Sequence, residues 1–85
     1  MSYVENPVML RRGYVRSVEV AQVLGKSLTT VHRWYLDGLV KGARDGRALY
    51  VLVDSLVEMF KTEGNEPMAD VARTLKRPTR AAATG

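Results

Sequence analysis

Two short amphipathic segments separated by only two residues constrain this chain more than any other feature. Ser17 is a good N-cap, because its hydroxyl can accept a hydrogen bond from a free amide in the first turn, and the apolar spacing predicts a helix over residues 18–24. We expect Gly25 to end that helix in the left-handed conformation. Ser27 then caps a second helix, which Gly38 terminates. A turn this tight forces a sharp crossing of the two helices, as in a helix-turn-helix unit.

The apolar positions of the two segments indicate which faces pack together. The expected contacts are made by Val20, Ala21 and Leu24 of the first helix and by Val31, Trp34 and Tyr35 of the second. Because Trp34 shares a face with Val31, we interpret it as a core residue rather than as a residue that stacks on bases. The polar side chains of the second helix are left on its outward face.

That outward face has the character of a DNA-reading surface. The N-terminal residues of such a helix can contact base edges in the major groove. Arg33 can reach guanine or a phosphate, and Thr29 a base, a thymine methyl group or a phosphate. His32 has no partner that would suggest catalysis or metal binding, so it is either a DNA contact or a solvated surface residue. The candidate DNA contacts in this helix are Ser27, Leu28, Thr29, Thr30, His32 and Arg33.

A β-hairpin is predicted next along the chain. Asp45-Gly46 lies between two strand-like segments, residues 39–44 and 47–51, and this dipeptide is a strong hairpin signal. Arg44 and Arg47 flank the expected tip. A tip with paired arginines can lie along phosphates or enter a narrow minor groove, whose negative potential favours arginine. We therefore add both arginines to the candidate DNA contacts.

The second half of the chain carries weaker signals. Asp54 is expected to cap a third helix over residues 55–61. A break follows at residues 64–67, and residues 68–76 have the pattern of a short amphipathic helix. The sequence leaves open whether that helix docks on the domain or binds a partner. Residues after Pro78 are expected to be disordered.

These elements predict a single small domain of the α+β class, mostly α. We expect an N-terminal arm over residues 1–13, extended, with or without a short strand around residues 8–10. Residues 14–62 would form a winged helix-turn-helix with a two-stranded β-hairpin as its wing. Residues 63–85 would form a short helix and a disordered basic tail.

Composition excludes several function classes. The 85 residues leave no room for a deep substrate cleft. The absence of cysteine excludes disulfides, zinc fingers and thiol nucleophiles, and the single histidine offers no metal cluster. We therefore expect no enzyme activity, no metal and no cofactor. No apolar run approaches the roughly 20 residues of a membrane span, and polar residues at 5–7 argue against a signal peptide, so a cytoplasmic protein is expected.

The formal net charge of +4 favours a polyanionic partner only weakly, since many domains carry such a charge for solubility. Its distribution says more. Arg11, Arg12 and Arg16 cluster early in the chain, as either a phosphate clamp or a solubilising arm. We include Arg16 among the candidate DNA contacts.

Several of these segments together resemble excisionase-like and MerR-like winged helix proteins. Residues 14–25, YVRSVEVAQVLG, resemble their first helix and turn, and residues 27–34, SLTTVHRW, resemble their recognition helix. Residues 37–40, DGLV, are similar to their exit into the wing. Residues 47–51, RALYV, and 54–56, DSL, are similar to the return strand and the last helix. The resemblance covers over half of the chain.

The resemblance implies sequence-specific binding to double-stranded DNA without catalysis. It favours a phage excisionase, a recombination directionality factor that binds and bends attachment-site DNA cooperatively and promotes excision by an integrase. Self-association on DNA or a homodimer is then expected, within the nucleoid of a bacterial cell. The alternatives are a small MerR-like repressor or a phage terminase small subunit. A full MerR regulator, which dimerises through a long coiled coil, is disfavoured because no heptads follow residue 61. A further alternative is a protein-interaction adaptor with a degenerate helix-turn-helix.

Overall fold

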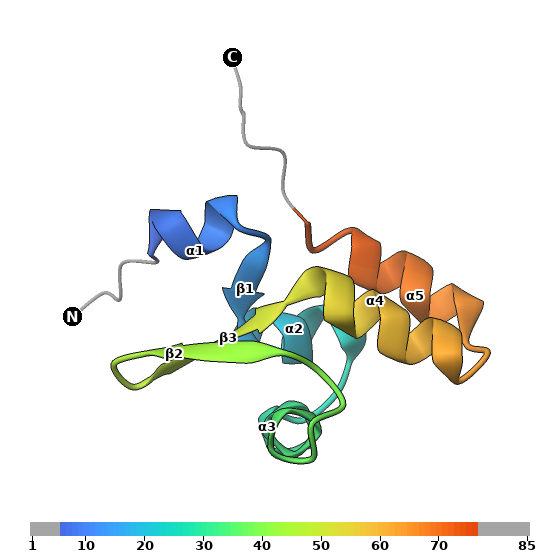
Figure 1. The fold of residues 1–85 in the computed structure, drawn as a ribbon. Helices are drawn as coiled ribbons and strands as arrows, with labels where there is room; N and C mark the ends of the chain where they lie inside the picture. Colours follow the sequence, from blue (N-terminus) through green and yellow to red (C-terminus); the bar gives the residue numbers. More distant parts are fainter. Residues whose placement is uncertain (1–5, 77–85) are drawn as a thin grey trace.

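Strand β3 (Ala48–Leu52) is the centre of the sheet. It pairs antiparallel with β2 (Gly42–Asp45) on one side and with β1 (Tyr14–Arg16) on the other, in the order β1-β3-β2. These strands and five helices make up residues 6–76, the part of the chain that this computed structural model describes (Figure 1). The predicted α+β class is confirmed. The sheet has one strand more than the predicted hairpin, because β1 also pairs with β3, with Tyr14 opposite Leu52.

The helices surround this sheet unevenly. They are α1 (Pro7–Arg11), α2 (Ser17–Leu24), α3 (Leu28–Leu36), α4 (Val53–Thr62) and α5 (Glu66–Arg73). Helices α4 and α5 lie side by side, and α2 packs against α5 and β3. Helix α3 packs mainly on α2, and α1 lies across the sheet from it (Figure 1). Because it has so few helical neighbours, α3 keeps one long side open to solvent.

The connection between α2 and α3 forms as the sequence predicts. Gly25 has φ +68°, and its N–H and that of Lys26 donate to the carbonyls of Gln22 and Ala21. A left-handed residue is needed to make these bonds, and glycine adopts that conformation without steric cost. Ser27 caps α3 by accepting a 3.1 Å hydrogen bond from the N–H of Thr30. The end of α2 and the start of α3 therefore lie at residues that the sequence identifies.

The predicted cap of the first helix is wrong. Ser17 is the first residue of α2, and Arg16 occupies the N-cap position without a side-chain hydrogen bond. The Ser17 side chain is buried, and its hydroxyl shares a 3.2 Å hydrogen bond with Nε2 of His32 in α3. A residue interpreted as a local cap is thus a contact between the two helices.

The N-terminal arm contains a helix where an extended segment was expected. Asn6 caps α1 by accepting hydrogen bonds from the N–H groups of Val8 and Met9, and Pro7 follows at the first position, where its missing N–H costs nothing. The strand expected around residues 8–10 is therefore wrong. The arm is also fastened to the sheet, because the Asn6 N–H donates to the Tyr50 hydroxyl at 2.9 Å.

Two boundaries differ in the second half of the chain. Helix α4 begins at Val53 rather than after Asp54, with Leu52 at its N-cap and no side-chain cap. The Asp54 carboxylate instead pairs with Lys76 at 3.3 Å. Helix α5 begins at Glu66 because Asn65, in the expected break, caps it by accepting from the N–H of Met68. The tail predicted to be disordered lies outside the described residues.

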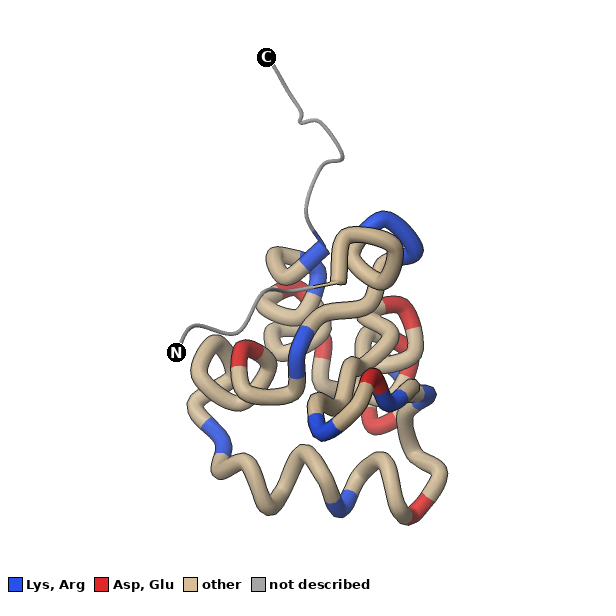
Figure 2. Tube along the Cα trace, turned by 90° about the vertical axis from the view of Figure 1, so that its left-hand side faces the viewer, with Lys and Arg blue, Asp and Glu red and all other residues tan. Residues whose placement is uncertain are grey.

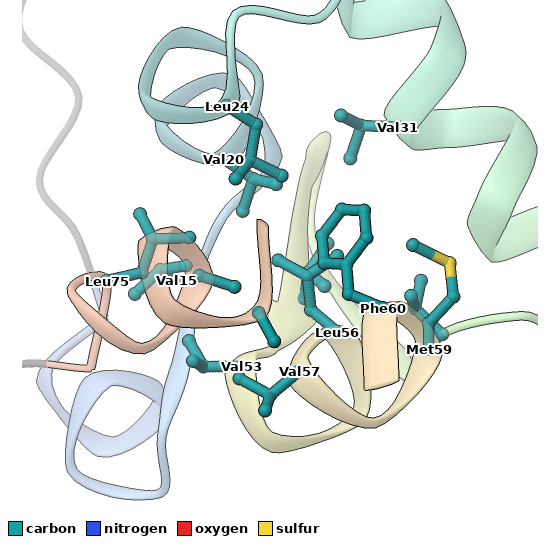
Figure 3. Close-up of a cluster of buried hydrophobic side chains, with 14 of the residues drawn as sticks. Val15, Val20, Leu24, Val31, Val53, Leu56, Val57, Met59, Phe60 and Leu75 are labelled. Atoms are coloured by element: carbon teal, nitrogen blue, oxygen red, sulfur yellow. The ribbon is translucent and has the colours of Figure 1, made fainter. Parts of the chain in front are cut away.

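One apolar core joins β1, β3 and helices α2 to α5, and Leu10 of α1 packs against it. Figure 3 shows Val20 and Leu24 of α2 and Val31 of α3 directed toward Leu56 and Phe60 of α4. Beyond the residues labelled there, the core includes Ala21, Val40, Val51, Ala69 and Ala72. The ring of Trp34 meets that of Phe60 edge-on, with centroids 5.8 Å apart. Trp34 is thus a core contact, as predicted, and it helps to fix α3 against α4.

Gly42 is required by a close approach between α3 and the sheet. A Cβ atom at this position would lie 2.8 Å from Cδ1 of Tyr35 and 2.9 Å from the backbone oxygen of Tyr50. We expect Gly42→Ala to lower the free energy of unfolding by about 1–3 kcal/mol, the usual range for overpacking. Urea unfolding followed by circular dichroism would measure it. Lys41→Ala, at the exposed neighbouring position, is the control, and equal stability of the two variants would contradict this account.

Candidate nucleic-acid interface

The exposed side of α3 carries three of the side chains proposed to contact DNA. Leu28, Thr29 and Arg33 are exposed, and Leu28 keeps 42% of its surface accessible. Thr30 and His32 are half-buried. The helix therefore presents a bulky apolar group, a hydroxyl and a guanidinium within its first two turns.

Ser27 and Thr30 form a closed local pair. Besides the cap bond, the two hydroxyls lie 2.8 Å apart and share a hydrogen bond. Both hydroxyl oxygens already take part in hydrogen bonds within the chain, so these residues order the start of α3. Their hydroxyl groups are less available to a ligand than an unbonded hydroxyl would be. The N–H groups of the first turn remain at the helix N-terminus, where the helix dipole favours an anion such as a phosphate.

Three contacts hold α3 in place behind its exposed face. His32 bonds to buried Ser17, Trp34 packs on Phe60, and Tyr35 lies against Gly42. With 3.6 residues per turn, these three residues lie on the side of the helix opposite Arg33, so one side of α3 is fixed while the other is exposed. The hydrogen bond to Ser17 gives His32 a structural partner that neither interpretation from the sequence included.

The hairpin places two exposed arginines beside α3. Asp45 pairs with Ala48, so the turn consists of Gly46 and Arg47 rather than Asp45 and Gly46. Arg47 is thus in the turn itself, and Arg44 is in the strand that leads to it. The Asp45 carboxylate between them accepts a 3.1 Å hydrogen bond from the side chain of Asn6. Helix α1 therefore supports the hairpin near its tip.

Arg16 differs from the other candidates. It ends β1 opposite Tyr50 and is half-buried at the junction with α2. Its backbone is fixed by the sheet and its side chain is less accessible than those of Arg33, Arg44 and Arg47.

Charge is distributed unequally between the two parts of the molecule. Residues 26–47 carry five basic and two acidic side chains, whereas residues 48–76 carry three basic and five acidic ones. In Figure 2, α3 lies along the bottom with the hairpin above it, and both carry Lys or Arg. The segment that contains α3 and the hairpin turn is therefore more basic than the segment that follows it, and it attracts a polyanion.

Sequence reasoning missed three exposed residues near this face. Lys26 lies in the α2–α3 turn, next to the N-terminus of α3, and its position before the cap could have identified it. Leu36, the last residue of α3, and Leu39, in the loop that follows, are 75% and 50% exposed. Their apolar character gave no signal, since burial depends on where the following strand runs.

Other kinds of site were also sought within residues 6–76. No three His, Cys, Asp or Glu side chains there come together as metal ligands would. None of the helices in this range has the length and apolar content to cross a bilayer. Comparisons of the chain with protein-family models, curated proteins and solved structures return no match.

Proposed function

We propose that this protein is a sequence-specific DNA-binding protein, with α2 and α3 as a helix-turn-helix unit and the β2–β3 hairpin as its wing. The observation that carries the proposal is the exposed face of α3, with Arg33 accessible on a helix whose opposite side is fixed to the core. A rigid helix with free side chains on one face suits readout in the major groove.

The hairpin extends the proposed contact. With α3 in a major groove, the arginines of the wing would follow the neighbouring phosphates or enter the minor groove. Arg44 and Arg47 are exposed for this role, and the bond between Asn6 and Asp45 orders the strand that carries them. Ser27, Leu28, Thr29, Thr30 and His32 would complete the α3 contact, and Arg16 a contact at its side.

Within this class, we infer the role of an excisionase that acts on DNA architecture rather than by catalysis. Copies bound side by side would bend attachment-site DNA and assist an integrase in excision. Bending 20–30 base pairs costs of order 1–6 kcal/mol, which contacts between neighbouring copies would offset. The sequence resemblance over residues 14–61 supports this role.

Selection of duplexes from a random DNA library with the purified protein tests the proposal. We expect enrichment of short direct repeats in tandem, because cooperative assembly places copies head to tail. Enrichment of a single inverted repeat would indicate a dimeric repressor instead of an excisionase. No enriched sequence at moderate salt would overturn site-specific DNA binding altogether.

A further inference from the structure

A groove at the other end of the hairpin does not belong to the proposed DNA face. It has a volume of about 600 Å³ and lies between α4 and the loop that joins α3 to β2. Its lining includes Lys41 and Leu52, which pair at the opposite end of the two strands from the turn at Gly46. A ligand in this groove would therefore leave the hairpin tip free.

The floor of the groove is apolar and its rim is acidic. Leu39, Val40 and Met59 line it, and the half-exposed Leu39 leads toward Leu36 on α3. Its acidic lining residues are Asp54 and Glu58 of α4 and Glu63, which caps the end of that helix, whereas Lys41 is the one basic residue in the lining that residues 6–76 form. Among the described residues, Glu58 and Glu63 have no ion pair, and Asp54 has Lys76. In a chain of net charge +4, this local excess of carboxylates stands out and would repel DNA.

The walls of the groove are fixed before any ligand binds. The Ser55 hydroxyl donates to the carbonyl of Leu52 and accepts a 2.9 Å hydrogen bond from the N–H of Lys41. These bonds join the loop to the first turn of α4. A preformed site loses less entropy when it binds a ligand. Along α4, the acidic residues from 54 to 63 span roughly 13 Å, the length of about four extended residues.

We propose that this groove binds a short segment of a partner protein, basic and carrying a large apolar side chain. The apolar side chain would enter between Leu39 and Met59, and its flanking lysines or arginines would face Glu58 and Glu63. Complementary charge sets the choice of partner and the rate of encounter. The protein would then have two surfaces of opposite charge, one for DNA and one for a protein. This inference does not depend on the DNA proposal.

Selection from a random peptide library displayed on phage, against the full immobilised chain, tests the proposal. We expect enriched peptides to combine Lys or Arg with Leu, Ile or Phe. A synthetic copy of one of them should lose roughly tenfold in affinity for the double variant Glu58→Lys/Glu63→Lys, measured by fluorescence anisotropy. The control is Glu66→Lys/Asp70→Lys, which makes the same charge change on exposed acidic residues of α5. Thermal unfolding shows that each variant is folded.

The other outcomes overturn the proposal. If the enriched peptides are neutral or acidic, or if no peptide is enriched, the groove does not bind a basic segment. If the α5 control variant loses as much affinity as Glu58→Lys/Glu63→Lys, the loss results from the change in net charge alone. If peptides are enriched only on a chain that lacks residues 77–85, the chain's own tail occupies the groove. Self-association that Glu58→Lys/Glu63→Lys abolishes makes a second copy the occupant. Because no DNA is present, failure here leaves the DNA proposal intact, and the reverse also holds.

Discussion

Replacing Phe60 with alanine is expected to lower the free energy of unfolding by about 3–5 kcal/mol. The side chain is 3% exposed and packs edge-on against Trp34, so the substitution leaves a cavity where α3 meets α4. Chains of this length have a total stability of roughly 4–13 kcal/mol, so the loss would remove much of it. Urea unfolding followed by circular dichroism measures the effect.

The control variant, Phe60→Leu, keeps most of the side-chain volume but removes the aromatic ring. Phe60→Leu should cost less than about 2 kcal/mol, since it loses the aromatic contact but fills the site. Trp34 is the only tryptophan, so its fluorescence reports whether α3 still packs in either variant. Similar stabilities for the alanine and leucine variants would contradict the account, because the cavity and not the ring carries most of the predicted cost.

Arg33→Ala is expected to weaken binding to a selected DNA site by about 10- to 100-fold, equivalent to roughly 1–3 kcal/mol, without destabilising the fold. Arg33 is exposed on α3 and takes part in no ion pair among the described residues, so its removal disturbs little else. The affinity is measured by fluorescence anisotropy at several salt concentrations. If the contact is to a phosphate, the salt dependence should flatten by about 0.9 in log–log slope. If Arg33 instead contacts a guanine, the alanine variant should discriminate less between bases at that position.

Two matched variants separate the proposed contact from an effect of charge. Arg73→Ala removes the same charge from an exposed position on α5, where Arg73 pairs with Asp70, and should change affinity little. Arg33→Lys keeps the charge but lacks the planar fork that binds two acceptors at once. Equal losses for Arg33→Ala and Arg73→Ala would mean that net charge alone attracts DNA.

Local signals predicted the parts of the fold that form within a few residues. Gly25 and Ser27 define the turn between α2 and α3 through backbone bonds to immediate neighbours, and such signals are explicit in a sequence. Helix α1 was not predicted, although its local signals, Asn6 followed by Pro7, are present, because no long periodic segment follows them. Strand β1 could not be predicted in this way, because its partner β3 lies more than thirty residues later.

The candidate site was predictable in composition but not in arrangement. That α3 leaves Arg33 exposed follows from the periodicity of Val31 and Trp34, and the structure agrees. The hydrogen bond between Ser17 and His32 was not predictable, because either side chain has a plausible local or solvated role. The acid-rimmed groove depends on the path of the loop over α4, which no pattern in the sequence specifies.

The strand order also determines when this protein can finish folding during its synthesis. Strand β1 leaves the ribosome early, yet its only partner within residues 6–76 is β3, which emerges after two helices and a hairpin strand. Helix α2 cannot be fully packed until α5 has been made, since it packs on α5 as well as on β3. A nascent chain that pauses before residue 48 therefore exposes Val15, Val20 and Leu24 to water and to chaperones, because strand β3 and helices α4 and α5, which complete their burial, have not yet been made.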